Sequence, residues 1–358
     1  MGEFQVGNAT STSMNTLVPN FSVQNGKIDN VYNIQNTYWE FNDASKQLGY
    51  YKKIPELKKA IDALSLWTVG KGFSCNSLTK VTVDYFVGYG EDTFVSLMWN
   101  MIVQKKVFGD AFAEIVRVKK QIVNLKPLYT GNMRIYFTEN GVIDHYEHRQ
   151  ANGKYKTYQP DEIFHLANDR IANEMHGTSV IDACKDVIDF RNELLTDYRK
   201  LTHRDLALGV MYVEADKESD LTAVKNKYAD AVKNGEVLVL PKGTAELADS
   251  PTRSHQDRLA LIQYLEGFFY QAVGVPRVIA SSQDYSEASS KVGFLTFEPV
   301  YTFEQTLLEA DLWNQLGMRI TFNRPPSLMD SMQSSEGKNT GQTGFQPNDV
   351  QTSVTRTE

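Results

Sequence analysis

Cysteine and clustered metal ligands are nearly missing from this chain of 358 residues. The two cysteines, Cys75 and Cys184, lie far apart, and no Cys or His stands at the spacing of a zinc site. A disulfide framework or a structural zinc is therefore not expected, and the composition suits a reducing cytosol. We expect no cofactor of any kind.

A secretory leader and a long apolar run are also lacking. The first residues, MGEFQVGNATSTSMNT, contain no apolar h-region. The longest strongly apolar stretches, such as FVSLMWNMIV at 94–103, are too short to span a bilayer. The sequence predicts a soluble intracellular product without a membrane partner.

Clustered basic charge is the third absence. The chain carries 37 Lys and Arg against 44 Asp and Glu, which gives a net charge of −7. Proteins that hold nucleic acid tightly neutralise phosphates with grouped Lys and Arg side chains. If DNA is a partner, we expect it to be held weakly and without sequence specificity.

The hydrophobic share of 41% and the charged share of 23% are those of a chain that mostly folds. Residues 1–45 are rich in Asn, Ser, Thr and Gln, and we interpret them as an arm that packs on something else. Residues 326–358 are polar and lack apolar periodicity, so they are predicted to be disordered. The folded part is expected to cover about 46–325.

The first half of this folded part reads as helices followed by strands. One helix is predicted over IPELKKAIDALSLWTVG, with Pro55 in its first turn, and a second over about 91–107. Short alternating runs follow between 109 and 169, with a hairpin signal at Asn140-Gly141. The pattern indicates an α+β unit with an antiparallel sheet.

The second half contains longer helices. One helix is predicted over 178–203, capped by Thr178 or Ser179, with Asp182 completing a capping box for Ser179. A small β-α-β insert follows, with strands at 209–216 and 236–243 around a helix at 220–235. Further helices are predicted to end at Gly274 and to cover 287–316, and a last strand covers 318–323. Pro299 should kink or break the third helix.

The string HRDL at 203–206 raises the possibility of a protein-kinase catalytic loop. That motif continues HRDLxxxN, and here the Asn position is Val210. The nearest glycine-rich string, GYGEDT at 88–93, lacks the third glycine. His203 and Arg204 are better explained as cations in the last turn of a helix.

The remaining candidate side chains also favour structural roles. His145 and His148 lie three apart on a strand, so their side chains point to opposite faces and cannot share a metal. His165 is interpreted as a hydrogen-bonded histidine at a sheet edge, and Ser179 as a cap without a base. The aromatic run YLEGFFYQ at 264–271 is interpreted as a packing face. No catalytic constellation emerges, and we expect no enzyme.

The order of several segments resembles a known family. The segments follow one another in this order: GDAFAEIVR, LKPLYTGNMRIYF, DEIFHLAND with HGTSVIDACKDVI, VLVLPKG, HQDRL with AVGVPRVIA, and FLTFEPVYTFEQTLLEADLW. Together they resemble the portal proteins of tailed bacteriophages, above all the HK97-like branch. The resemblance covers about residues 50–325, and little chain follows 325 from which a helical crown could be built.

This resemblance implies a portal-type α+β fold and a ring of about twelve copies at one capsid vertex of the virion. The mixed helix-sheet part, 46–177 with 287–325, would be the wing. The stem would be formed by 178–203 and 253–275, the clip by 204–252 and a tunnel loop by 276–290. Implied partners are the major capsid protein, the terminase large subunit, a head-completion or adaptor protein, and double-stranded DNA in the channel. Assembly would take place in the host cytoplasm.

The resemblance also implies where functional residues lie. The tunnel loop would face DNA with Arg277, Ser281, Ser282, Gln283, Asp284, Tyr285, Ser286 and Glu287. Gly274 and Pro276 would form a hinge beside it. Partner docking on the clip would use Lys217, Glu218, Lys225, Lys227, Asp230 and Lys233. A non-portal structural or adaptor protein of a virion and a kinase-like phosphotransfer enzyme remain the alternatives.

Overall fold

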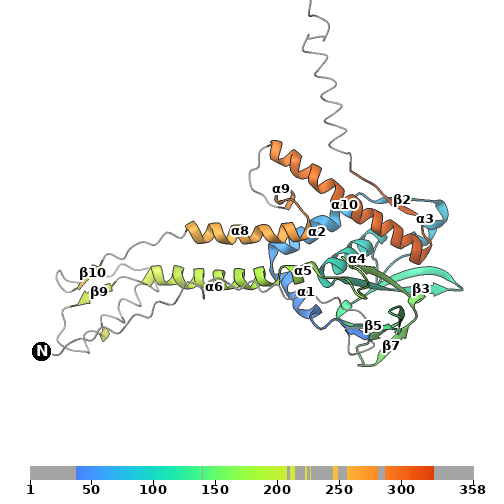
Figure 1. Ribbon diagram of the computed structural model, residues 1–358, viewed down its shortest axis with the longest axis horizontal. Coiled ribbons are helices and arrows are strands. Elements are labelled where there is room, and N and C mark those ends of the chain that lie inside the picture. The colour runs from blue at the N-terminus through green and yellow to red at the C-terminus, as the bar shows by residue number, and fades with distance from the viewer. Residues whose placement is uncertain are drawn as a thin grey trace, which may run out of the picture.

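The computed structural model describes residues 38–138, 140–207, 210–213, 222–223, 226, 245–248, 256–280 and 287–325. A mixed body of helices and small sheets occupies one end of the molecule (Figure 1). Two long helices, α6 (Lys185–Ala207) and α8 (Gln256–Val273), run side by side out of this body. The α+β class predicted from the sequence is confirmed.

Helices pack the centre of the body. α1 (Ala44–Lys53) leads directly into α2 (Pro55–Val69), which starts at the proline that the sequence indicated. α4 (Phe94–Phe108) is buried on most sides, and Thr93 and Ser96 close its first turn as a capping box. α3 (Ser77–Asp84), a short helix that we did not predict, is capped by the Asn76 side chain.

The strands of the first half form two antiparallel sheets instead of one. The order β4-β3-β8 joins β3 (Asp110–Val118), β4 (Gln121–Leu128) and β8 (Ile163–Ala167). The order β1-β5-β6-β7 joins β1 (Tyr38–Glu40), β5 (Met133–Phe137), β6 (Ile143–Arg149) and β7 (Tyr155–Tyr158). The turns η2 (Thr130–Asn132) and η3 (Pro160–Glu162) precede β5 and β8.

The predicted boundary between an arm and the folded body at residue 45 is therefore wrong. Tyr38 pairs with Tyr136 and Glu40 with Arg134, so β1 is an edge strand of the body's four-stranded sheet. α1 begins at Ala44, whose side chain is buried in the core. The body extends at least to Tyr38 because these residues are held by partners that lie far along the chain.

A third small sheet closes the body from the other end of the chain. β11 (Ile320–Phe322), the core of the predicted last strand, pairs with β2 (Phe73–Cys75). Phe322 and Phe73 sit in a cluster with Leu308, Leu312 and Leu316 of α10 (Glu287–Leu316). The C-terminal helix and strand are thus part of the same folded unit as α2 and α4.

The predicted single helix at 178–203 is two helices. α5 (Val180–Ala183) is one turn long, Cys184 follows it, and α6 then continues to Ala207. Ser179 caps α5 by accepting a hydrogen bond from the backbone N of Ile181 at 3.0 Å. Asp182 does not complete the expected box, because its carboxylate accepts from Gln47 Nε2 at 3.0 Å.

The insert between α6 and α8 is described only in part. β9 (Val210–Val213) lies within the first predicted strand and pairs antiparallel with β10 (Ala245–Ala248). β10 begins after Gly243, where the sequence predicted that the second strand would already have ended. The predicted strand at 236–243 and most of the predicted helix at 220–235 lie outside the described residues.

α10 starts and ends where the sequence placed it, and Pro299 does not break it. Proline cannot donate a backbone hydrogen bond. Pro299 lies on the exposed side of α10, so water can satisfy the carbonyl one turn before it.

Within the described part of the chain, no helix has both the length and the apolar character needed to cross a membrane. The same residues contain no group of three or more His, Cys, Asp or Glu side chains that could hold a metal ion.

Candidate functional site: the paired helices and their root

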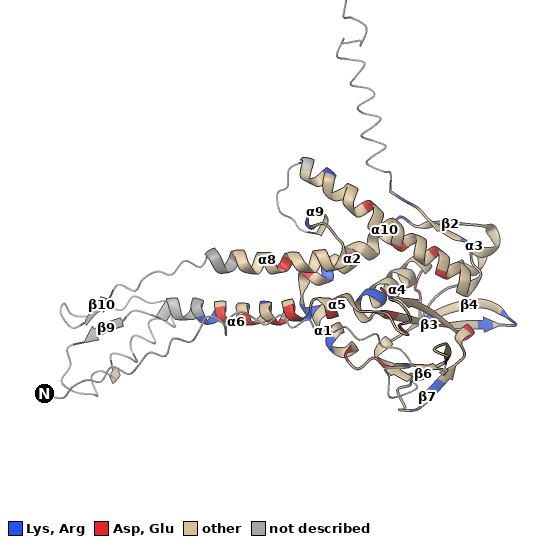
Figure 2. Ribbon diagram, in the orientation of Figure 1, with Lys and Arg blue, Asp and Glu red and all other residues tan. Residues whose placement is uncertain are grey.

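An acidic face runs along the exposed side of α6 (Figure 2). Asp186, Asp189, Glu193 and Asp197 are all exposed, and their spacing of three or four places them on one face of the helix. Carboxylates four residues apart destabilise a helix by roughly 0.2–0.5 kcal/mol per pair. Lys200, 3.2 Å from Asp197, compensates this repulsion only at one end. Asp186 lies in the first turn, where the helix dipole favours a carboxylate, but Asp189, Glu193 and Asp197 do not serve helix stability.

The opposite side of α6 and one side of α8 hold the pair in the body. Cys184 and Ile188 are buried beside Phe269 and Val273 of α8 and the residues of α2. Burial raises the pKa of the Cys184 thiol to about 11, so this cysteine is an inert packing residue at neutral pH.

Four charged side chains from four helices meet at the root of the pair. Arg191 of α6 donates from Nη2 to both carboxylate oxygens of Glu56 of α2 at 3.0 Å. Glu266 of α8 lies with its Oε2 3.9 Å from Nη2 of Arg277. Burial raises the pKa of Glu266 and the neighbouring Glu56 raises it further, while Arg191 and Arg277 oppose the shift. This root cluster, Glu56, Arg191, Glu266 and Arg277, ties α6 and α8 to the body.

The turn that ends α8 contains the two residues predicted as a hinge. Gly274 has a φ of +77°, and its N–H and that of Val275 donate to carbonyls of the last turn of α8. A Cβ on Gly274 would stand 3.3 Å from Cγ1 of Val300 on α10. Pro276 follows and leads into α9 (Arg277–Ala280). A glycine is required here because a side chain is strained at this φ.

The predicted tunnel loop at 276–290 is shorter in the structure. Residues 277–280 form α9, and Glu287 is the first residue of α10. A Cβ on Gly293 of α10 would lie 2.4 Å from Cγ1 of Val278, so the two helices pack closely. Only 281–286 remain between them, and Ser281, Ser282, Gln283, Asp284, Tyr285 and Ser286 lie outside the described residues.

Arg277 does not stand free beside this loop. Its Nη2 donates to the carbonyl of Gln263 at 3.1 Å, and it belongs to the root cluster. Its role as a DNA-facing residue of the tunnel loop stays a prediction. The six clip residues predicted to dock partners, Lys217, Glu218, Lys225, Lys227, Asp230 and Lys233, also lie outside the described residues.

The HRDL string lies inside α6, which continues to Ala207. A kinase needs the Asp of this motif in a catalytic loop, followed by a magnesium-binding Asn. The helical backbone removes the loop, and Val210 at the Asn position belongs to β9. The kinase-like alternative is excluded at this motif.

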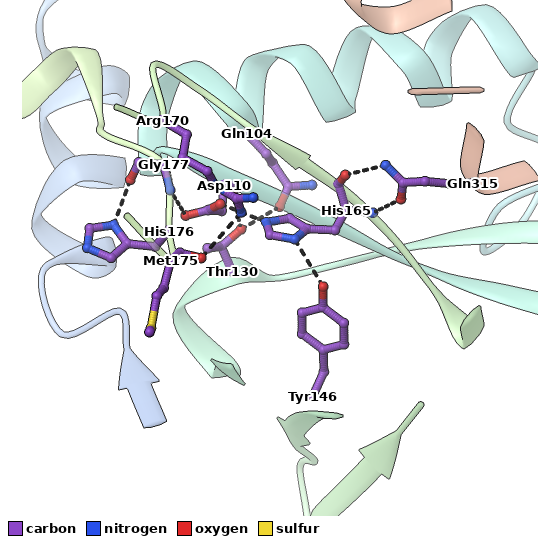
Figure 3. A network of polar contacts seen from close by, with 10 residues as sticks. All are labelled: Gln104, Asp110, Thr130, Tyr146, His165, Arg170, Met175, His176, Gly177 and Gln315. Carbon is purple, nitrogen blue, oxygen red and sulfur yellow. Dashed lines mark hydrogen bonds and ion pairs between the residues drawn. The ribbon is translucent and has the colours of Figure 1, made fainter. Parts of the chain in front are cut away.

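A network of buried polar contacts centres on Asp110 and His165 (Figure 3). Oδ1 of Asp110 lies 2.7 Å from Nε2 of His165, whose Nδ1 lies 3.1 Å from the Tyr146 hydroxyl. Oδ2 of Asp110 accepts from the backbone N of Gly177 at 2.8 Å. Both ring nitrogens of His165 have protein partners, which confirms the hydrogen-bonded edge histidine. Burial raises the pKa of Tyr146, so its hydroxyl stays protonated.

An open cavity of about 470 Å³ adjoins this network. Its lining includes Tyr146 and His165 from the sheets, Arg170, and Leu307 and Asp311 of α10. Burial raises the pKa of Asp311, against the nearby Lys105 and His165. Asp110 and Tyr146 already hold both nitrogens of the His165 imidazole, so neither nitrogen is available to activate a nucleophile.

A buried ionic cluster between α4 and α10 was not predicted from the sequence. Glu304 lies against Nζ of Lys105 and 3.1 Å from Nζ of Lys106, and all three side chains are buried. Lys106 also donates to Oδ1 of Asn168 at 2.8 Å. Only the position of two lysines at the end of a strongly apolar helix could have suggested buried partners.

The two other histidines singled out in the sequence lie on opposite faces of β6, and both are half-buried. His145 stacks on Tyr136 with ring centroids 4.3 Å apart, and its Nδ1 lies 2.7 Å from Asp144 Oδ2. Partial burial lowers the pKa of His148, with Glu114 opposing and Lys156 adding to the shift.

Comparisons with known proteins agree with this architecture. The family model described as phage portal protein matches residues 90–334. No curated protein matches the chain. A chain from the virion of a native gene transfer agent particle is 16% identical with a TM-score of 0.61, over 85% of this chain and 90% of that chain.

Two further solved structures share the fold. The neck of the native gene transfer agent particle, computed with C12 symmetry, contains a chain that is 17% identical with a TM-score of 0.61, over 87% of this chain and 92% of that one. An HK97 family phage portal protein from Corynebacterium diphtheriae is 16% identical with a TM-score of 0.50, over 82% and 98%. The family match covers well over half of the chain, and it also sets aside the alternative of a non-portal virion protein. The chain belongs to the phage portal protein family.

Proposed function

We propose that copies of this chain form a closed ring, of about twelve subunits, at one vertex of a capsid, and that DNA enters and leaves through its channel. The observation that carries the proposal is the acidic face of α6, on a helix pair that projects from a folded body. The structural neighbour solved with C12 symmetry supports the ring.

In this arrangement α6 and α8 are the stem that surrounds the channel. The body, 38–177 with 287–325, is the wing that contacts the major capsid protein. The segment 204–252, with β9 and β10, is the clip at which the terminase large subunit and later a head-completion or adaptor protein dock. The segment 281–286, between α9 and α10, is the tunnel loop.

The acidic face explains how such a channel can enclose DNA without binding it tightly. Duplex DNA carries one negative charge per roughly 1.7 Å of its axis, and proteins bind it by neutralising phosphates with Lys and Arg. Asp186, Asp189, Glu193 and Asp197, repeated around a ring, neutralise none of them. The duplex therefore slides past the stem, driven by the ATP-dependent terminase. The ring itself hydrolyses nothing, is assembled in the host cytoplasm and remains in the virion.

Charge reversal on the stem tests this role. Asp189→Lys with Glu193→Lys should leave the rings closed, since both side chains are exposed, but should make them retain DNA. We expect purified rings of this variant to bind duplex DNA more tightly than unmodified rings do. This affinity should fall steeply as the salt concentration rises, and DNA packaging should be slower. The matched control is Asp144→Lys with Asp161→Lys, which makes the same charge change on exposed residues of the body.

Two results would count against the proposal. One is a purified chain that stays monomeric, or forms assemblies without an axial hole, in negative-stain images under all assembly conditions. The other is a stem variant whose rings bind DNA no better than the control rings do.

Deletion of 281–286 tests the tunnel loop separately. Rings should still form because α9 and α10 are held by their own packing at Val278 and Gly293. Packaging or retention of DNA should be impaired. DNA-filled, stable heads in normal yield from this variant would contradict the loop's role while leaving the ring itself in place.

A further inference from the structure

The outer side of α10 carries an apolar stripe that none of the described residues covers. Starting at Val292, exposed residues recur at alternating steps of four and three along the helix. This outer stripe consists of Val292, Thr296, Pro299, Phe303, Thr306, Ala310 and Trp313, with Leu307 beside it. None of these residues is charged. Val292 and Phe303 are 60% and 64% exposed.

α10 does not need this stripe in order to pack against the body. The opposite side of the helix already buries Phe297, Tyr301, Leu308 and Leu312 in the two main clusters of the body. A surface helix of a globular protein normally presents charged and polar residues opposite its apolar face. α10 is apolar on both sides, which is typical of a helix that packs against other elements on two opposite sides.

The two hydroxyls on the stripe do not need water either. The Thr296 hydroxyl donates to the carbonyl of Gly293 at 2.9 Å, and the Thr306 hydroxyl donates to the carbonyl of Thr302 at 2.9 Å. Both threonines can therefore be covered without leaving an unsatisfied hydroxyl, which would cost about 1–3 kcal/mol. The guanidinium of Arg319 lies over the Trp313 ring, with its Cζ 4.5 Å from the ring centroid.

We propose that the outer stripe of α10 is the seam along which each copy of the chain packs against a helix of the next copy in the ring. The proposal rests on the proposed function and names the partner of one surface of the body. The repeat of four and three averages 3.5 residues, the spacing at which a helix presents a continuous seam to another helix.

The composition of the stripe argues for a permanent partner of the same kind. Interfaces of obligate homo-oligomers are apolar, poor in charge and enriched in aromatic residues, whereas exchangeable interfaces are more polar. A protein that docks only transiently, such as a motor, does not fit an uncharged stripe spanning roughly 30 Å of helix. Another copy of this chain, which stays bound as long as the ring exists, fits such a stripe.

A ring also requires two different surfaces on each copy, because head-to-tail contacts are not self-complementary. The chain offers a second exposed apolar surface around α3. Leu78, Val81 and Tyr85 follow the same spacing of three and four, and Val87 and Tyr89 extend the surface. All five side chains are between 46% and 79% exposed. The described residues thus supply both halves that a heterologous contact needs.

Cysteine protection tests the seam. Phe303→Cys is made in a Cys75→Ser background, and the buried Cys184 stays in place. Monomeric chain and assembled rings are separated by size, and each is treated with a maleimide-polyethylene glycol reagent. We expect the cysteine at 303 to react in the monomer and at least about tenfold more slowly in the ring, because a packed interface core excludes solvent.

The matched control is Val142→Cys in the same background, at the exposed tip of the β5–β6 hairpin. This cysteine should react equally in monomers and rings. Equal reactivity of the cysteine at 303 in monomers and rings would overturn the inference. Protection that appears only after rings are built into heads would also overturn it, because the partner would then be the capsid shell.

A second pair of variants covers the case in which the cysteine probe perturbs assembly. Val292→Lys with Phe303→Lys should abolish rings while leaving the melting temperature of the monomer unchanged, since both side chains are exposed in the single chain. Val142→Lys should leave rings intact. Rings from the double lysine variant, in normal yield, would refute the seam. Failure of the unmodified chain to form rings would instead refute the proposed function.

Discussion

The side-chain amide of Gln315 closes the free edge of β8 by pairing with both backbone polar groups of His165. Oε1 of Gln315 accepts from the His165 backbone N at 2.8 Å, and Nε2 donates to the His165 carbonyl at 2.7 Å. β8 pairs with β3 on its other side, so Gln315 stands where a further strand would lie. An edge left open would be a template for unwanted pairing. α10 therefore covers the sheet and ends its hydrogen-bond ladder.

The first prediction concerns this clamp. Gln315→Leu should lower the free energy of unfolding by about 1–3 kcal/mol, because it leaves a partly buried N–H and carbonyl of His165 without their partners. Urea unfolding of the monomeric chain measures the change. Asn314→Leu, an exposed neighbour on the same helix, should shift stability by no more than about 0.5 kcal/mol. Equal effects of the two substitutions would contradict the role of the clamp.

The second prediction concerns Glu304, which compensates two buried lysines. Glu304→Leu should cost about 3–5 kcal/mol, because it leaves the charges of Lys105 and Lys106 buried without a carboxylate. Replacing all three residues, by Lys105→Met, Lys106→Met and Glu304→Leu, should recover most of that loss, since apolar groups of similar volume need no charge partner. A triple variant as unstable as the single one would show that the ionic contacts are not the cause.

The same residue predicts a pH dependence. Burial alone would raise the pKa of Glu304, but Lys106 and Lys105 outweigh it and hold the pKa below its ordinary value. A carboxyl whose pKa is lower in the folded chain than in the unfolded chain stabilises the fold above the unfolded pKa, about 4.3. That stabilisation is lost as the pH falls through the folded pKa. Urea midpoints between pH 7 and 3 should therefore fall less for Glu304→Gln than for the unmodified chain.

What the sequence predicted well depends on signals within a few residues. Pro55 marks the start of α2, Ser179 caps α5, and Asn140-Gly141 lies between β5 and β6, because each acts through its own backbone geometry. α3, which Asn76 caps, was not predicted, because a helix of 8 residues is too short for its apolar period to stand out.

Pairings between distant segments could not be predicted in this way. β1 with β5 and β2 with β11 join segments whose own patterns say nothing of their partners. An alternating pattern shows which face of a strand is buried but not which strand lies beside it, so one sheet was expected where two exist. At the site, Gly274 could be read from its place after an apolar helix. The contact of Arg191 with Glu56 could not, because charge alone indicates an exposed position.

The third prediction compares two glycines of one segment. Gly274→Ala should destabilise the chain by about 1–2 kcal/mol, because alanine is strained at a φ of +77°. Gly267→Ala, inside α8, should stabilise it by about 0.5–1 kcal/mol, since a Cβ there meets no atom within 4 Å. Differential scanning fluorimetry should give melting temperatures that move in opposite directions. A shift of the same sign in both variants would argue against the strained turn.

The last prediction concerns the root cluster and has the opposite pH dependence to Glu304. The pKa of Glu266 is raised by burial and by Glu56, and Arg191 and Arg277 limit the shift. A carboxyl with a raised pKa in the folded chain disfavours the fold above that pKa, and this cost disappears as the pH falls toward the unfolded value. Arg191→Gln removes one of the two opposing cations and should lower stability at pH 7.5 by about 1–3 kcal/mol, through lost charged hydrogen bonds to Glu56.

Part of this loss should return at mildly acidic pH. Lowering the pH from 7.5 to 5.5 should raise the melting temperature of the Arg191→Gln variant more than that of the unmodified chain. Adding Glu266→Gln should remove this extra gain, because no carboxyl is then left to protonate beside Glu56. Hydrogen exchange should locate the effect in the first turns of α6 and in α8, where the helices enter the body. A pH response spread evenly over the chain would mean that the cluster does not anchor the stem.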